Sequence, residues 1–149
     1  GKSIDLSVLV TIAASLSLGA ALQATGVAAV IAGLINGTGI QSPWLLLALV
    51  YVVVSVMTEV ITNNAAAVLA LPIALEVGRL AGIAAEPMVF AVMMAASASF
   101  ATPLGYQTNL MVYGPGNYRF SDFLRVGVPM NLFIGVVTVA LISWQYDLG

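Results

Sequence analysis

The sequence predicts an all-α membrane protein, in which transmembrane helices accompany a re-entrant helical hairpin and a broken helix. Of its 149 residues, 61% are hydrophobic and 7% are charged, whereas soluble domains have about 45–50% apolar and about 25% charged residues. The apolar residues come in long blocks instead of a one-sided helical stripe, so the helices are apolar all round. Two polar segments, 58–64 and 101–109, interrupt these blocks.

The charged and reactive residues exclude several classes of function. The net charge is −2 and the basic residues are scattered, so no nucleic-acid partner is expected, because such a partner requires a basic patch. The chain has no cysteine and no histidine, which excludes disulfides, thiolate nucleophiles, imidazole bases and Cys/His metal sites. An enzyme is the weakest class, and no cofactor is expected. Any cation site must be built of oxygen atoms, which suits hard ions.

Segment lengths distinguish helices that cross a bilayer from helices that do not. A hydrocarbon core of ~30 Å requires about 20 helical residues. Segments 5–24 and 126–146 meet that length and are predicted to be transmembrane helices, the second being the last one. The apolar stretches 43–57, 65–75 and 88–101 are too short. Interrupted apolar segments indicate the binding site of a transporter, because broken helices persist in a bilayer only inside protein or beside a wet cavity.

The first interruption predicts a re-entrant hairpin over residues 43–80 with its tip at 58–64. One helix enters the bilayer, the polar tip reverses the chain, and a second helix returns to the same side. Residues 26–36, before the hairpin, are too short to cross and are predicted to form an interfacial helix.

The second interruption predicts a broken helix over residues 88–116 with its break at 101–109. Pro103 lacks a backbone donor and prevents regular helix before it, and Gly105 permits unusual dihedral angles. The chain does not begin with Met and opens with no signal-peptide pattern. Residues 1–149 are therefore interpreted as a segment excised from a longer protein.

A hairpin tip and a break both place helix ends at membrane depth. The carbonyl groups at a helix C-terminus suit a cation, and the N–H groups at a helix N-terminus suit an anion. Neutral polar side chains surround both interruptions: Thr58, Thr62, Asn63, Asn64, Thr102, Gln107, Thr108 and Asn109. These groups could hold an alkali cation and an oxyanion side by side. The structural alternative is an ordinary N-cap and an ordinary turn; the functional interpretation is preferred because both interruptions lie in segments too short to span.

Glu59 raises a separate question, because a carboxylate at membrane depth costs roughly 2.5–3.5 kcal/mol and requires a partner. It could complement the charge of a cation, or it could brace the tip by accepting backbone N–H bonds. We favour bracing, since a ligand of an anion should not itself be negative.

These motifs resemble those of the divalent anion:sodium symporters, which include sodium-coupled dicarboxylate, citrate and sulfate transporters. The resemblance rests on Thr58-Glu59-Val60-Ile61-Thr62-Asn63-Asn64-Ala65 followed by Pro72, on Ala101-Thr102-Pro103 through Gly114-Pro115-Gly116, on Ser121 through Gly127, and on Leu18 through Gly26. It covers nearly the whole chain. It implies one of two inverted repeats of an elevator-type homodimer, with the missing N-terminal half of the same transporter completing the site.

The resemblance also implies ligands. The sodium ligands would be Thr58, Ile61, Asn63 and Ala101, partly through backbone oxygens, and no other metal is implied. The substrate anion would meet Thr62, Asn63, Asn64, Thr102 and Pro103, to which the polar residues Thr108 and Asn109 are added.

The chain departs from the family pattern at two places that bear on the substrate. Thr62-Asn63-Asn64 replaces Ser-Asn-Thr, and Leu104 through Asn109 replaces the usual second proline and asparagine. The second variant looks more like members associated with sulfate and other inorganic anions.

The expected function is therefore secondary active transport. Sodium, as the coupling ion, would drive symport of a divalent oxyanion, with sulfate favoured over di- and tricarboxylates. The protein would lie in the lipid bilayer of a bacterial inner membrane. The alternatives are a channel-like subunit and a structural membrane subunit, neither of which couples transport to an ion.

Overall fold

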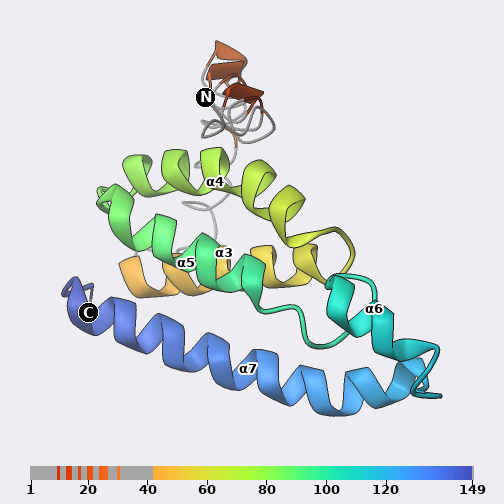
Figure 1. Cartoon of the computed structure of the whole chain (residues 1–149). Coiled ribbons are helices and arrows are strands. Elements are labelled where there is room, and N and C mark those ends of the chain that lie inside the picture. Colours follow the sequence, from red (N-terminus) through yellow and green to blue (C-terminus); the bar gives the residue numbers. More distant parts are fainter. Residues whose placement is uncertain are drawn as a thin grey trace, which may run out of the picture.

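The structure is a computed structural model, which describes residues 42–148 and scattered residues between 10 and 30. The described part contains helices and no strands (Figure 1). The helices are α3 (Pro43–Thr58), α4 (Asn63–Leu80), α5 (Ala85–Ser97), α6 (Gln107–Tyr113) and α7 (Phe120–Gln145). The predicted interfacial helix 26–36 and most of the predicted transmembrane helix 5–24 lie outside the described residues.

The helices stack in three layers. α3 and α5 pack against each other in the middle layer, and both contact α4 on one side and α7 on the other. Figure 1 shows α4 above this pair, the long blue α7 below it and α6 at one end. α6 approaches α7 through Tyr113 and Phe123, whose ring centroids are 5.9 Å apart.

Small residues allow α4 to pack closely on α5. Ala66, Ala70 and Ala74 recur every fourth residue on α4 and are buried. Gly78 continues this row, and a Cβ there would stand 2.8 Å from Cγ of Met88. Since residues four apart share one face of a helix, this face brings the two backbones together in the manner of membrane helices.

The chain reverses direction between α3 and α4, as Figure 1 shows. Pro43 begins α3, where a proline loses no hydrogen bond. Thr62 is the N-cap of α4, and its hydroxyl accepts a bond of 3.4 Å from the Ala65 N–H. Thr58 ends α3 and Asn63 begins α4, so the turn is tighter than the predicted tip 58–64.

The second interruption begins earlier than the predicted break 101–109. α5 ends at Ser97 and α6 begins at Gln107. Pro103 prevents helix from running through the break, because its ring clashes with the carbonyl of Ser99, four residues before it, and it disfavours helix at Thr102, directly before it. Thr108 and Asn109 consequently lie in the first turn of α6.

α7 begins at Phe120 rather than at Val126, where the last transmembrane helix was predicted to start. Its first turn is closed by the Asp122 carboxylate, which accepts a bond of 2.7 Å from the Arg119 N–H. The charged segment around Arg125 is therefore the first part of α7.

Among the described residues, α7 is the one helix that is both long and apolar enough to cross a membrane. Much of its apolar surface is not covered by the described chain: Leu132 is 70% exposed, and Phe133 and Val136 are each 64% exposed. Such a surface is typical of a helix that faces lipid or further protein.

Candidate functional site

The two interruptions, 42 residues apart in sequence at Glu59 and Ala101, lie against each other. The Ala101 N–H donates to Oε1 of Glu59 at 3.0 Å. The Thr102 hydroxyl donates to the backbone carbonyl of Glu59 at 2.6 Å. The first bond confirms that the Glu59 side chain accepts a backbone N–H group, as expected of a bracing role. Both bonds connect the turn between α3 and α4 to the segment between α5 and α6.

A third connection involves the end of α3. The Ser99 hydroxyl donates to the Thr58 carbonyl at 3.1 Å, and both residues are buried. Gly105 lies at the same place, since a Cβ there would overlap with Ser99 Oγ and the Thr58 carbonyl oxygen. Carbonyl groups at the end of α3 were expected to be free for a cation. The Thr58 carbonyl instead accepts a hydrogen bond from the Ser99 hydroxyl.

The Thr58 side chain connects α3 to both neighbouring helices. Its hydroxyl oxygen lies 2.8 Å from the Ala96 carbonyl oxygen and 3.1 Å from Asn63 Oδ1. Thr58 is fully buried. The Ala96 carbonyl is in the last turn of α5, where carbonyl groups lack helical partners, so the hydroxyl satisfies it.

Asn109 holds the segment between α5 and α6 in shape. Its amide Nδ2 lies 3.1 Å from the Ser99 carbonyl and 3.1 Å from the Thr102 carbonyl. An amide NH2 group has two hydrogens, so it can donate to both oxygens. This segment is therefore ordered by side chains rather than by a helical ladder.

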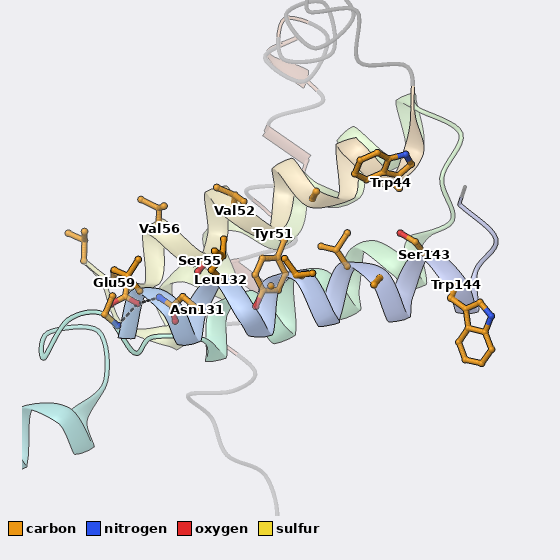
Figure 2. A pocket seen from close by; sticks show the side chains of 18 of the residues that line it. Trp44, Tyr51, Val52, Ser55, Val56, Glu59, Asn131, Leu132, Ser143 and Trp144 are labelled. Atoms are coloured by element: carbon orange, nitrogen blue, oxygen red, sulfur yellow. Dashed lines mark hydrogen bonds between the residues drawn. The ribbon is translucent and has the colours of Figure 1, made fainter. Parts of the chain in front are cut away.

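A groove of about 950 Å³ runs between α3 and α7 and ends at this site (Figure 2). Its walls are mainly apolar and include Val52, Val56 and Leu132. Figure 2 shows Trp44 and Trp144 toward one end and the bonded pair Glu59 and Asn131 at the other.

The predicted site residues fall into two groups. The first group lies where the two interruptions meet, and each member is hydrogen-bonded to another member, to Glu59 or to Ser99: Thr58, Asn63, Ala101, Thr102 and Asn109. Pro103 is buried beside them. Ile61 is half-buried, and Thr62 caps α4. Asn64 and Thr108 are exposed, and neither side chain makes a hydrogen bond within the described part of the chain.

Asn131 is the residue that sequence reasoning missed. It lies in α7 and donates from Nδ2 to Oε1 of Glu59 at 2.5 Å, across 72 residues of sequence. The available signal was its place inside an apolar span, since a polar side chain at membrane depth requires a partner.

Comparison with known proteins agrees with this architecture. Residues 2–147 match the model of the citrate transporter family, CitMHS. The chain is 41% identical over 145 residues to an uncharacterized transporter, sll0640, of Synechocystis, a match that covers 97% of this chain and 24% of that protein. It is 40% identical over 146 residues to sodium/sulfate cotransporter 1 of Chlamydomonas reinhardtii, with 97% and 17% covered. The uncharacterized transporter YfbS of Escherichia coli is 39% identical, with 97% and 25% covered.

The chain thus spans about a quarter or less of the length of these relatives. The family and the named relatives are transporters rather than enzymes, as the absence of a nucleophile–base pair in the sequence predicts. An all-helical architecture with an apolar α7 fits such proteins. With nearly its whole length matched, this chain belongs to the citrate transporter family.

Proposed function

We propose that this chain forms the C-terminal half of a secondary active transporter that couples sodium to symport of a divalent oxyanion, with sulfate favoured. The observation that carries the proposal is the direct contact between the two interruptions, through the Ala101 N–H and the Glu59 carboxylate at 3.0 Å. This contact brings two sets of helix ends into one place. Several relatives at 39–40% identity are named as sodium/sulfate cotransporters, which supports the choice of ions.

The cation would bind between the turn and the break. The carbonyl oxygens of Ile61 and Ala101 accept no hydrogen bond from the described residues, and both are therefore available as ligands. Neutral oxygens of this kind suit a hard cation.

Asn63 would add a side-chain oxygen to this set. The Thr58 hydroxyl has one hydrogen, and the shorter contact, 2.8 Å to the Ala96 carbonyl, uses it. Asn63 Oδ1 lies 3.1 Å from the same hydroxyl oxygen, which has no second hydrogen to give it. This oxygen, at the turn, would therefore be available to sodium.

The anion would bind at the N-terminus of α4. The N–H groups of Asn63 and Asn64 begin this helix and have no helical acceptor, and the helix dipole favours negative charge there. The hydroxyls of Thr62 and Thr102 lie beside the turn, and Pro103 would contribute an apolar contact. Thr108, in α6, would be the anion contact most distant from the turn. Asn109 would act by holding the break in shape through its bonds to the Ser99 and Thr102 carbonyls.

The thickness of the bilayer determines the roles proposed for α3 and α4. α3 and α4 would form a re-entrant hairpin, because 16 residues at 1.5 Å per residue cover about 24 Å of a ~30 Å core. The turn would then lie at membrane depth, where irregular backbone must be enclosed by protein. The missing N-terminal half would supply the inverted repeat, and the homodimer and elevator motion follow from the family resemblance.

Uptake by the full-length protein in proteoliposomes tests this proposal. We expect saturable uptake of radiolabelled sulfate that requires an inward sodium gradient and stops when potassium replaces sodium. Competition by unlabelled citrate and succinate separates sulfate from carboxylates as the substrate, which matters because the family description names citrate. Saturable uptake that is unaffected by potassium would contradict sodium coupling, and flux that does not saturate would favour a channel-like subunit.

A further inference from the structure

Asn131 is attached to the site by a single strong contact. Its Nδ2 lies 2.5 Å from Oε1 of Glu59, and the same oxygen accepts the Ala101 N–H at 3.0 Å. One carboxylate oxygen therefore joins the turn after α3, the break after α5 and the middle of α7. A hydrogen bond to a charged group is about twice as strong as one between neutral groups.

The surroundings strengthen this contact. Glu59 Oε2 and Asn131 Oδ1 are both buried and have no partner among the described residues. Both side chains line the end of the groove, beside the apolar side chains of Val56, Val128 and Leu132. Among the described residues, Asn131 and Ala101 are the two donors to this carboxylate, and removal of either leaves it with a single donor.

The helix face that carries Asn131 is shaped to approach the site. Gly127, Asn131 and Gly135 are spaced four residues apart and so share one face of α7. A Cβ at Gly127 would overlap with the Phe100 carbonyl, and one at Gly135 would stand 2.9 Å from Cε1 of Tyr51. The two glycines bring α7 against the break on one side and α3 on the other, which places the Asn131 amide between them.

We propose that Asn131 is a positioning residue of the transporter. By holding the Glu59 carboxylate, it maintains the spacing between the turn and the break, and hence between Ile61, Asn63 and Ala101 as cation ligands. It touches neither ion. This inference rests on the proposed function, and it assigns to α7 a direct part in sodium affinity.

The test compares sodium dependence in the full-length transporter, reconstituted in proteoliposomes. Asn131→Ala removes the donor, and we expect the sodium concentration for half-maximal sulfate uptake to rise about tenfold. The half-saturating sulfate concentration at saturating sodium should change less than about twofold. Asn131→Asp keeps the shape of the side chain but sets a carboxylate against Glu59, and it should raise the sodium requirement further than alanine does.

Two comparisons separate positioning from a general structural effect. Ser143→Ala removes another buried polar group of α7 that lines the same groove without touching Glu59, and its sodium dependence should equal that of the wild type. In a Glu59→Gln background, Asn131→Ala should raise the sodium requirement only about threefold, because the amide then faces a neutral oxygen.

The outcomes distinguish this inference from the proposed function. If the wild-type protein takes up sulfate without sodium, or transports no anion, sodium-coupled sulfate symport fails. If the wild type requires sodium but Asn131→Ala and Asn131→Asp leave that requirement unchanged, the positioning role is wrong. Equal effects of Asn131→Ala in the wild-type and Glu59→Gln backgrounds would also overturn it. If Asn131→Ala does not fold, the isosteric Asn131→Asp variant decides the question.

Discussion

Gly105 lies directly against the Thr58 carbonyl group, so the break after α5 touches the last residue of α3 with no side chain between them. The Ser99 hydroxyl donates to the same carbonyl oxygen at 3.1 Å. Both contacts are buried, and they set how closely the two interruptions approach each other. A residue larger than glycine at 105 must push the break away from α3.

We therefore predict that Gly105→Ala separates the interruptions. The added methyl group would overlap with backbone and with Ser99 Oγ, and overpacking of this kind costs about 1–3 kcal/mol. Sulfate uptake should fall at least about tenfold, with a lower midpoint of thermal unfolding in detergent. Gly114→Ala is the matched control, because a Cβ there meets nothing within 4 Å and its φ of −72° suits alanine. Wild-type uptake by Gly105→Ala would show that the spacing is unimportant.

Asn63→Ala should abolish uptake while the protein remains folded. The change removes the proposed sodium ligand and the 3.1 Å contact with Thr58, yet it leaves a residue with high helix propensity at the start of α4. A loss of at least about tenfold in uptake corresponds to ~1.4 kcal/mol of lost interaction. Uptake and size-exclusion behaviour are measured on the same preparation, with Gln145→Ala, an exposed amide at the end of α7, as control. Normal uptake by Asn63→Ala would remove the turn from the mechanism.

Two variants of Glu59 test whether its side chain acts by accepting hydrogen bonds or by its negative charge. Glutamine retains an oxygen that can accept from the Ala101 N–H and Asn131 Nδ2, whereas alanine leaves both donors without their acceptor, at about 1–3 kcal/mol each if they remain buried. Glu59→Gln should keep most of the uptake, and Glu59→Ala should lose it and unfold at a lower temperature. The measurements are initial uptake rates and thermal unfolding in detergent. Equal loss of uptake in both variants, with Glu59→Gln as stable as the wild type, would show that the carboxylate charge acts on the cation directly.

Local features of the sequence predict much of this arrangement. The positions of both interruptions are predictable from the short apolar segments and the polar residues between them. Pro103 and the polar residues around Asn63 favour a helix end or a helix start at their own positions, without help from distant segments. Local rules also bear on boundaries that differ from the prediction by several residues: Pro103 prevents helix directly before it, and the Arg119–Asp122 bond closes the first turn of α7, which begins at Phe120.

Contacts between distant segments were not predictable in the same way. The Glu59–Asn131 bond joins residues 72 positions apart, and it depends on how α7 crosses α3 and α5. A single sequence indicates that a buried carboxylate requires a partner, but it does not identify the partner. The same holds for Ser99, whose sequence context of small residues indicates only close packing, although its hydroxyl caps the Thr58 carbonyl.

Asn109 should control the order of the break, and its loss should be visible without any transport measurement. Its amide donates to the carbonyls of Ser99 and Thr102, each at 3.1 Å. Asn109→Asp keeps the size of the side chain but removes both hydrogens, and at neutral pH it places a carboxylate beside two carbonyl oxygens. Backbone amides of residues 98–106 should then exchange with deuterium at least about tenfold faster, the factor for ~1.4 kcal/mol of lost local stability.

Thr108→Ala is the matched control for Asn109→Asp, since the neighbouring Thr108 side chain is exposed and makes no hydrogen bond within the described part of the chain. Exchange over 98–106 should stay at the wild-type rate in this variant. Any effect on uptake would then report anion contact instead of the order of the break. Unchanged exchange in Asn109→Asp would mean that the break is ordered by Pro103 and the Glu59 contacts, and that Asn109 is free to bind the anion directly.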